Sequence, residues 1–158
     1  MDNTIAIEPL QESHLPFLLE VRNECRQFLH DDRAFSLEEC RRWFAGTKPE
    51  FWLIRLDGEA IGYFRTGNPD RDARSIYVGA DLHPRFRGRG LARAAYELFL
   101  PFLRDRLSLR VVRLEVLSHN LAAQALYRRL GFVEVDRKRA FARRGGALVD
   151  SIIMEKRL

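Results

Sequence analysis

Two glycines and three arginines lie close together in the segment Leu82–Ala92, and residues of these types hold phosphate groups. The segment reads Leu-His-Pro-Arg-Phe-Arg-Gly-Arg-Gly-Leu-Ala. Glycine adopts positive φ at little cost and lets the main chain approach an anion closely, while arginine adds fixed charge and several N–H donors. The spacing therefore indicates a site for a phosphate or diphosphate. The alternative is an ordinary glycine-containing loop with solvated basic side chains.

The elements on either side place this segment at the start of a helix. Ser75–Leu82 is rich in strand-forming residues, and Leu91–Leu100 is apolar at helical spacing. The first turn of a helix exposes main-chain N–H groups without intrahelical partners and carries partial positive charge, so a phosphate fits there. A Walker A loop and a dinucleotide-binding loop are both excluded, because the first needs Gly-Lys-Ser/Thr and the second needs a third glycine.

A second pattern follows roughly thirty residues later. Val111–Leu117 predicts a strand and Asn120–Phe132 predicts a short helix, with Asn120 suited to its N-terminal cap and Gly131 to its C-terminal cap. The two patterns in this order are more specific than either pattern alone.

Taken together, the two patterns resemble the GNAT superfamily of N-acetyltransferases. Arg85-x-x-Gly88-x-Gly90 is similar to the loop with which that family binds the pyrophosphate of acetyl-CoA. The family's second signature is an asparagine, an alanine and a tyrosine closed by Gly-Phe, found here as Asn120, Ala123, Tyr127 and Gly131-Phe132. The resemblance implies acetyl-CoA as cosubstrate and an acyltransferase activity toward an amine.

Length and composition are those of one globular domain. At 158 residues, of which 46% are hydrophobic and 31% charged, the chain can form a core without disulfides or metals. We expect a single domain, 1–158, in the cytoplasm, because there is no signal-peptide pattern and no apolar run long enough to span a bilayer. Cys25 and Cys40 lack metal-ligand spacing and suit reduced thiols, and no metal is expected.

The net charge of +5 does not by itself indicate nucleic-acid binding. Of the 27 basic residues, three are lysine and 24 are arginine, and they are spread along the chain. Nucleic-acid-binding proteins cluster such residues on one face or in a tail. Nucleic acid is therefore not an expected partner, although an RNA-binding module and a non-catalytic protein that binds coenzyme A are the alternatives to an enzyme. The sequence leaves open whether two copies form a homodimer.

Along the chain the predicted order of elements is β, α, α, β, β, β, α, β, α, β, β. The polar stretch Asn68–Asp72 is expected to turn the chain, and Pro101 is expected to kink or weaken its helix by removing one N–H. The remaining predicted elements are a strand at Ile5–Ile7, helices at His14–Phe28 and from a Ser-x-x-Glu capping box at Ser36, strands Phe51–Leu56 and Glu59–Arg65 around an Asp57-Gly58 turn, and strands Val133–Phe141 and Leu148–Met154.

The same order is that of the GNAT fold, so the resemblance covers most of the chain. It implies an α/β (α+β) domain with a central mixed, mostly antiparallel sheet flanked by about four helices. In this family the strands that end here at Leu82 and Leu117 splay apart, and the cofactor lies in the gap between them. An N–H near Leu82 would face the thioester oxygen, and one such donor contributes about 3 to 4 kcal/mol of transition-state stabilisation.

The resemblance also implies the residues that bind the cofactor. Main-chain N–H groups of the glycine loop would contact the pyrophosphate, and the end of the Ser75–Leu82 strand would pair with the pantetheine arm. The expected set is Leu82, His83, Arg85, Arg87, Gly88, Arg89, Gly90, Leu91, Ala92, Asn120, Ala123 and Tyr127.

Three residues are candidates for proton transfer. By resemblance, the Tyr127 phenol would protonate the leaving thiolate of coenzyme A, the alternative being a tyrosine that packs beside the cofactor. The acceptor ammonium must lose a proton before it attacks, so a carboxylate or a water chain is expected nearby. Glu115 and Asp81 are the candidate bases, each with a salt-bridge role as the alternative. Some family members carry a glutamate near the start of the strand before the glycine loop. This chain has Arg74 close to that place, so the resemblance does not assign the base.

The acceptor is the least determined feature. The first helix, the Ser36 helix and the C-terminal segment resemble the subgroup of ribosomal-protein N-terminal, polyamine and nucleotide-sugar amine acetyltransferases. Asp31 and Asp32 could attract a cationic amine or form a solvated turn, and Trp43, Phe44 and Trp52 could stack on a ligand or pack in the core. We favour a small molecule such as an amino sugar, with a protein N-terminus or ribosomal protein as the alternative.

Overall fold

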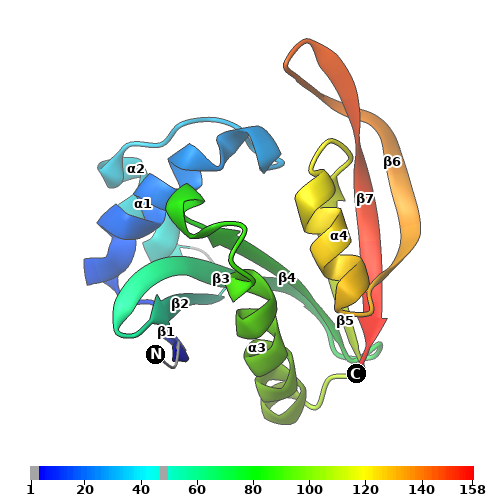
Figure 1. The fold of residues 1–158 in the computed structure, drawn as a ribbon, viewed down its shortest axis with the longest axis horizontal. Coiled ribbons are helices and arrows are strands. Elements are labelled where there is room, and N and C mark those ends of the chain that lie inside the picture. The colour runs from blue at the N-terminus through cyan, green and yellow to red at the C-terminus, as the bar shows by residue number, and fades with distance from the viewer. Residues whose placement is uncertain (1–3, 47–49) are drawn as a thin grey trace.

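Alternating apolar residues pair seven strands into one sheet, and helices cover both of its faces (Figure 1). The computed structural model describes residues 4–46 and 50–158. The strands are β1 (Ile5–Pro9), β2 (Glu50–Leu56), β3 (Glu59–Asp70), β4 (Ser75–Leu82), β5 (Val111–Leu117), β6 (Val133–Arg144) and β7 (Ala147–Arg157). The helices are α1 (Leu15–Glu24), α2 (Leu37–Gly46), α3 (Leu91–Leu107) and α4 (Leu121–Arg129), with 3-10 turns at Glu12–His14, Arg26–Phe28 and Pro84–Phe86.

The order of strands in the sheet is β1-β2-β3-β4-β5-β7-β6. Among the described residues, β4 and β5 form the one parallel pair, and all other neighbours are antiparallel. This pair is joined only through Ser75–Tyr77 and Val111–Arg113. Beyond those residues the two strands diverge (Figure 1). The predicted mixed, mostly antiparallel and splayed sheet is confirmed, and we call the space between the diverging strands the wedge.

Side chains on the two faces of the sheet form two separate cores. On one face β4 and β5 pack Val78, Leu82 and Leu114 against α3 and α4. On the other face Leu53 and Tyr63 pack against α1 and α2. Residues that alternate along a strand therefore face different pairs of helices. Tyr77, Gly79 and Asp81 alternate along β4 with Val78 and Leu82, so they belong to the α1–α2 face.

Several local predictions are confirmed. Asp57 and Gly58 form the two-residue turn between β2 and β3, with φ of +49° and +86°. The Glu39 N–H donates to Ser36 Oγ at 3.2 Å at the start of α2, which confirms the serine half of the predicted capping box. Gly131 ends α4 with a φ of +94°, a conformation that favours glycine.

Other elements differ from the prediction. The first helix ends at Glu24 and not at Phe28, because Cys25 contacts β4 and the chain turns there to reach the other side of the wedge. β3 continues to Asp70 through an irregularity after Gly67, so the turn lies at residues 71–74 and not at Asn68–Asp72. α3 continues through Pro101 to Leu107. β6 and β7 are each longer than predicted and form a long hairpin (Figure 1).

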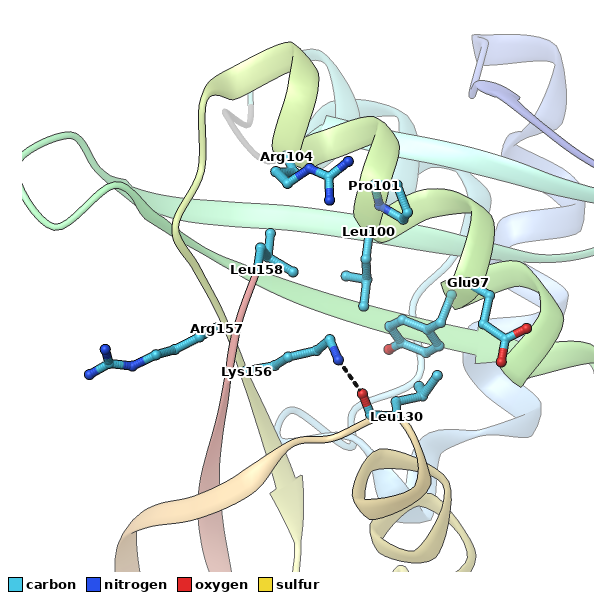
Figure 2. Close-up of a pocket in the computed structure, with 9 residues that line it drawn as sticks. Glu97, Leu100, Pro101, Arg104, Leu130, Lys156, Arg157 and Leu158 are labelled. Atoms are coloured by element: carbon cyan, nitrogen blue, oxygen red, sulfur yellow. Dashed lines mark hydrogen bonds between the residues drawn. The ribbon is translucent and has the colours of Figure 1, made fainter.

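None of the helices in residues 4–46 and 50–158 combines the length and the apolar character that a bilayer crossing needs. A separate pocket of about 350 Å³ lies between α3 and the end of β7, lined by Leu100, Arg104, Leu130 and Lys156 among others (Figure 2). Lys156 donates across it to the Leu130 carbonyl (Figure 2). Leu100 is about 14 Å along the helix axis from the start of α3 at 1.5 Å per residue, so this pocket is not the anion site predicted at the glycine loop.

Candidate active site

The loop before α3 exposes a row of main-chain N–H groups. Gly88 and Gly90 have φ of +71° and +74°, a conformation that favours glycine over other residues. Across residues 4–46 and 50–158, no acceptor is found for the N–H groups of residues 88–93. The partial positive charge at the start of the long helix α3 adds to them. The loop therefore fits a diphosphate such as that of coenzyme A.

The arginines of the loop are held by neighbouring groups. Arg85 pairs with Glu59 at 2.7 Å, and Arg87 contacts the Cys25 sulfur at 2.9 Å. The Arg89 guanidinium lies 5.8 Å from the centre of the Phe86 ring. These contacts place positive charge around the glycines, while the main chain supplies the directed donors.

The end of β4 turns its main chain toward the wedge at Leu82. His83 N–H donates to Ile61 O of β3 at 2.9 Å, so by strand alternation the amide groups of Leu82 point to the opposite edge. That edge faces the diverging β5. The Cys25 thiol lies 3.6 Å from the Leu82 carbonyl, and burial raises the pKa of Cys25 to about 11, so it is a neutral thiol. Leu82 N–H is therefore available to a ligand in the wedge, as the resemblance implies.

Tyr127 lies on the α3–α4 side of the sheet. Its ring is buried against Tyr96 of α3 and Phe132, with ring centroids 5.9 Å apart in both pairs. Burial raises the pKa of Tyr127 to about 12, so the phenol keeps its proton at neutral pH. Asn120 caps α4 by accepting from Ala123 N–H at 3.3 Å, which is the structural role considered for it.

The two candidate bases lie on the other face. On β5, Val112, Leu114 and Val116 face α3 and α4, so Glu115 faces the α1–α2 side. Asp81 shares that side and accepts from the Tyr63 hydroxyl at 2.8 Å. Tyr127 and the two carboxylates thus lie on opposite faces of the sheet, which suits a reaction in which cofactor and acceptor approach from different faces.

The two candidate bases, Asp81 and Glu115, have different surroundings. Burial raises the pKa of Asp81 above its usual value, in spite of the Tyr63 hydrogen bond and nearby arginines. Glu115 is paired with His30 Nε2 at 3.2 Å and Lys138 Nζ at 3.6 Å. Glu115 is partly exposed, with 27% of its side-chain surface accessible, so an amine can reach it.

A segment that the sequence did not single out crosses the open end of the wedge. We call Cys25–Arg33 the bridging segment. At its start the Cys25 thiol contacts the Leu82 carbonyl of β4. Further along, His119 Nε2 bonds to the Gln27 carbonyl at 2.9 Å, and Arg144 of the β6–β7 hairpin donates to the Leu29 carbonyl at 2.8 Å. These partners are about 60 to 120 residues apart in the chain, and no local motif marks such contacts.

The residues considered for acceptor recognition are occupied otherwise. Asp31 forms a two-point pair with Arg33, whose hydrogen bonds lower the pKa of Asp31 to about 2. Asp32 lies 3.6 Å from the Arg144 guanidinium. The aromatic residues follow the core alternative: Trp43 and Phe44 pack on Phe51, and Trp52 is buried against Phe99 and Phe102.

Comparison with known proteins agrees with this arrangement. The model of the acetyltransferase (GNAT) family matches residues 15–132. The N-alpha-acetyltransferase RimI of Mycobacterium tuberculosis is 36% identical over 132 residues, which cover 78% of this chain and 77% of that protein. The mycothiol acetyltransferase of Tsukamurella paurometabola is 38% identical over 88 residues, 54% of this chain and 30% of its own length.

A solved structure supports the fold. The spermidine N-acetyltransferase of Vibrio cholerae, in complex with CoA and spermine, superposes with a TM-score of 0.87 at 19% identity, covering 97% of this chain and 95% of that one. The loop, the wedge and the family match lead to one conclusion. The chain belongs to the GNAT family of acetyltransferases and is an acetyl-CoA-dependent N-acetyltransferase.

Proposed function

We propose that this enzyme acetylates the α-amino group of a polypeptide. The observation that carries the proposal is the 36% identity to an N-alpha-acetyltransferase over three quarters of both chains. This match favours the protein N-terminus over the amino sugar that the sequence analysis preferred. The occupied Asp31 and Asp32 agree with it, because they leave no obvious acidic site for a polycation at that turn.

In this proposal the main-chain N–H groups of residues 88–92 bind the cofactor diphosphate with the Arg87 side chain beside them, and Leu82 and His83 flank the pantetheine. The side chains of Asn120, Ala123 and Tyr127 line the opposite wall on α4. When bound, acetyl-CoA supplies an activated acetyl thioester. Leu82 N–H stabilises the negative charge that develops on the acetyl oxygen, because it is fixed at the wedge before the substrate arrives.

Glu115 is the proposed general base and Tyr127 the proposed general acid. Glu115 is partly exposed on the α1–α2 face and can accept a proton from an incoming ammonium. The buried Tyr127 phenol is protonated at neutral pH and can donate to a leaving thiolate. Asp81 is the second candidate base, although its hydrogen bond from Tyr63 and its burial give it less access to an acceptor.

The acceptor is tested with a substrate panel and mass spectrometry. The panel holds peptides with a free N-terminus, the same peptides with a blocked N-terminus and an internal lysine, spermidine and an amino sugar. We expect acetylation at the α-amine alone. Transfer confined to lysine side chains or to small amines would contradict the proposal.

Variants then test the base. We expect Glu115→Gln to lower kcat by about a hundredfold, the range for loss of a general acid or base, and Asp81→Asn to lower it much less. Affinity for coenzyme A, measured by titration calorimetry, should be unchanged in both. A larger loss in Asp81→Asn than in Glu115→Gln would move the assignment to Asp81.

A small-molecule amine is the second candidate acceptor. The 38% identity to a mycothiol acetyltransferase favours it, although the match spans 54% of this chain. The amino sugar in the panel decides between the two candidates.

A further inference from the structure

Three polar side chains connect the bridging segment to β5 and β7. His30 Nε2 lies 2.7 Å from Ser151 Oγ and 3.2 Å from Glu115 Oε2. The Ser151 hydroxyl donates to the same Glu115 oxygen at 3.0 Å. Ser151 is fully buried, whereas 30% of the His30 side-chain surface is exposed. The Glu115 carboxylate is thus linked through a serine to an imidazole that reaches solvent.

Neighbouring groups hold this imidazole in place. Phe141 packs against it with ring centroids 5.1 Å apart, and Arg144 donates to the His30 carbonyl at 3.2 Å. Burial lowers the pKa of His30 below its usual value, so the ring is neutral at pH 7. The charged groups that face it are Glu115 on β5, Lys138 and Arg144 on β6, and Arg65 on β3.

We propose that His30 is a positioning and proton-accepting residue for Glu115, which holds the carboxylate through Ser151 and takes up the proton that Glu115 removes from the acceptor. This inference rests on the proposed function, since it requires Glu115 to be the base. It adds a residue that no pattern in the sequence connects with the reaction.

The proton balance of the relay is complete. The ammonium N–H bond breaks and its proton joins Glu115. That proton moves to Ser151 Oγ while the hydroxyl proton of Ser151 moves to Nε2 of a neutral His30 whose other nitrogen carries the hydrogen. Glu115 is again a carboxylate, Ser151 is unchanged, and the imidazolium releases its proton to water. A His30 that is already protonated cannot accept, so the rate falls as His30 becomes protonated.

The test is the pH dependence of kcat with saturating acetyl-CoA and α-amine peptide. We expect the wild-type enzyme to lose rate as pH falls through the titration of His30. His30→Gln should lower kcat at pH 8 by about tenfold, below the usual range for a directly acting base, and should lack that loss at acid pH. An unchanged midpoint in His30→Gln, with or without a lower rate, would overturn the proposal.

His119 provides the matched control. Its Nε2 also bonds the bridging segment, at the Gln27 carbonyl, and its ring stacks on Phe28, but its contacts are not with Glu115. His119→Gln removes an imidazole of the same segment and should keep the wild-type midpoint. If His119→Gln and not His30→Gln abolished the acid-side loss, the relay would be wrong.

A readout that does not depend on turnover uses histidine-labelled protein and NMR. The Glu115 carboxylate raises the pKa of His30, so Glu115→Gln should lower the observed His30 midpoint. Ser151→Ala removes the hydroxyl through which the proton passes and keeps both end groups, so it should reproduce the kinetic profile of His30→Gln. An identical His30 midpoint in Glu115→Gln would refute the coupling. Absence of acetyl transfer by the wild-type enzyme would instead defeat the proposed function itself.

Discussion

Tyr127 and Glu115 stand on opposite faces of the sheet, and their positions divide the proposed reaction between two sides. Tyr127 extends from α4 into an aromatic cluster with Tyr96 of α3, where burial raises its pKa and keeps it protonated. Glu115 sits among polar groups beside the bridging segment. A phenol that stays protonated serves as an acid, and an accessible carboxylate serves as a base.

Tyr127→Phe tests the acid. The change removes one hydroxyl and keeps the ring contacts, so we expect kcat to fall by about a hundredfold with little change in affinity for coenzyme A. Steady-state kinetics and calorimetry measure the two quantities. The same change at Tyr77, at the paired end of β4 away from the wedge, is the control and should leave kcat near the wild-type value. Wild-type turnover in Tyr127→Phe, where chemistry limits the rate, would remove it from the acid role.

Asp81 gives a prediction about stability and pH. Its pKa is raised in the folded protein, so the ionised carboxylate costs stability at pH 7, and that cost disappears as pH falls below the unfolded value near 4. Asp81→Asn keeps an acceptor for the Tyr63 hydroxyl and should raise Tm more at pH 7 than at pH 4. Thermal melts at the two pH values measure this. Asp105→Asn, at an exposed site, is the control, and an equal effect of Asp81→Asn at both pH values would contradict the prediction.

At the scale of elements, the contact between β3 and β4 sets the edge of the wedge. Gly62 of β3 lies so close to β4 that an added Cβ would stand 2.3 Å from the Asp81 carbonyl and 2.6 Å from a Leu82 side-chain carbon. The small residue lets β4 approach closely just where Leu82 turns its amide toward the wedge. The shape of the wedge at Leu82 therefore depends on a glycine of β3, which lies outside both family signatures.

Gly62→Ala should be destabilising, because the backbone carbonyl cannot move aside as a flexible side chain could. We expect a loss of about 1 to 3 kcal/mol in unfolding free energy and weaker binding of coenzyme A. Chemical denaturation and calorimetry measure both. Gly46→Ala is the control, since no atom of residues 4–46 and 50–158, chain neighbours aside, lies within 4 Å of its added Cβ. Wild-type stability in Gly62→Ala would show that β3 and β4 can separate without cost.

The elements and the site differ in how far the sequence predicts them. Periodicity and turn residues such as Asp57 and Gly58 act locally, so the order of elements and the glycine loop follow from the chain alone. The end of α1 at Glu24 and the path of the bridging segment depend on contacts with β4 and β7, which no local pattern encodes. The positions of Glu115 and Asp81 on one face follow from alternation, but the partners of Glu115 do not.

At the scale of the whole molecule, the bridging segment ties the two sides of the wedge together. Arg144 in the β6–β7 hairpin donates to the Leu29 and His30 carbonyls and is mostly buried, with 10% of its side chain exposed. These two hydrogen bonds are strong, because a hydrogen bond with a charged partner is stronger than one between neutral groups. This contact holds the acceptor side of the site in one shape.

Arg144→Leu should loosen the bridging segment. We expect faster amide hydrogen exchange at residues 29–33 and a several-fold higher KM for the peptide acceptor, with unchanged affinity for coenzyme A. Exchange mass spectrometry and kinetics provide the measurements. Arg139→Leu, at an exposed position of the same strand, is the control. Unchanged exchange and KM in Arg144→Leu would show that the hairpin does not organise the acceptor side.

The short parallel contact between β4 and β5 has a mechanical consequence. Three residue pairs form a narrow seam between two lobes of the molecule, and in the proposed complex the cofactor lies beyond that seam, in the wedge between the lobes. Bound acetyl-CoA would then link the two lobes, so the rigidity of the whole protein would depend on the concentration of acetyl-CoA. Coenzyme A at about a hundred times its Kd should add about 2.7 kcal/mol to the unfolding free energy and raise Tm accordingly. If coenzyme A raised Tm but slowed amide hydrogen exchange in one lobe alone, it would bind that lobe only and the prediction would be wrong.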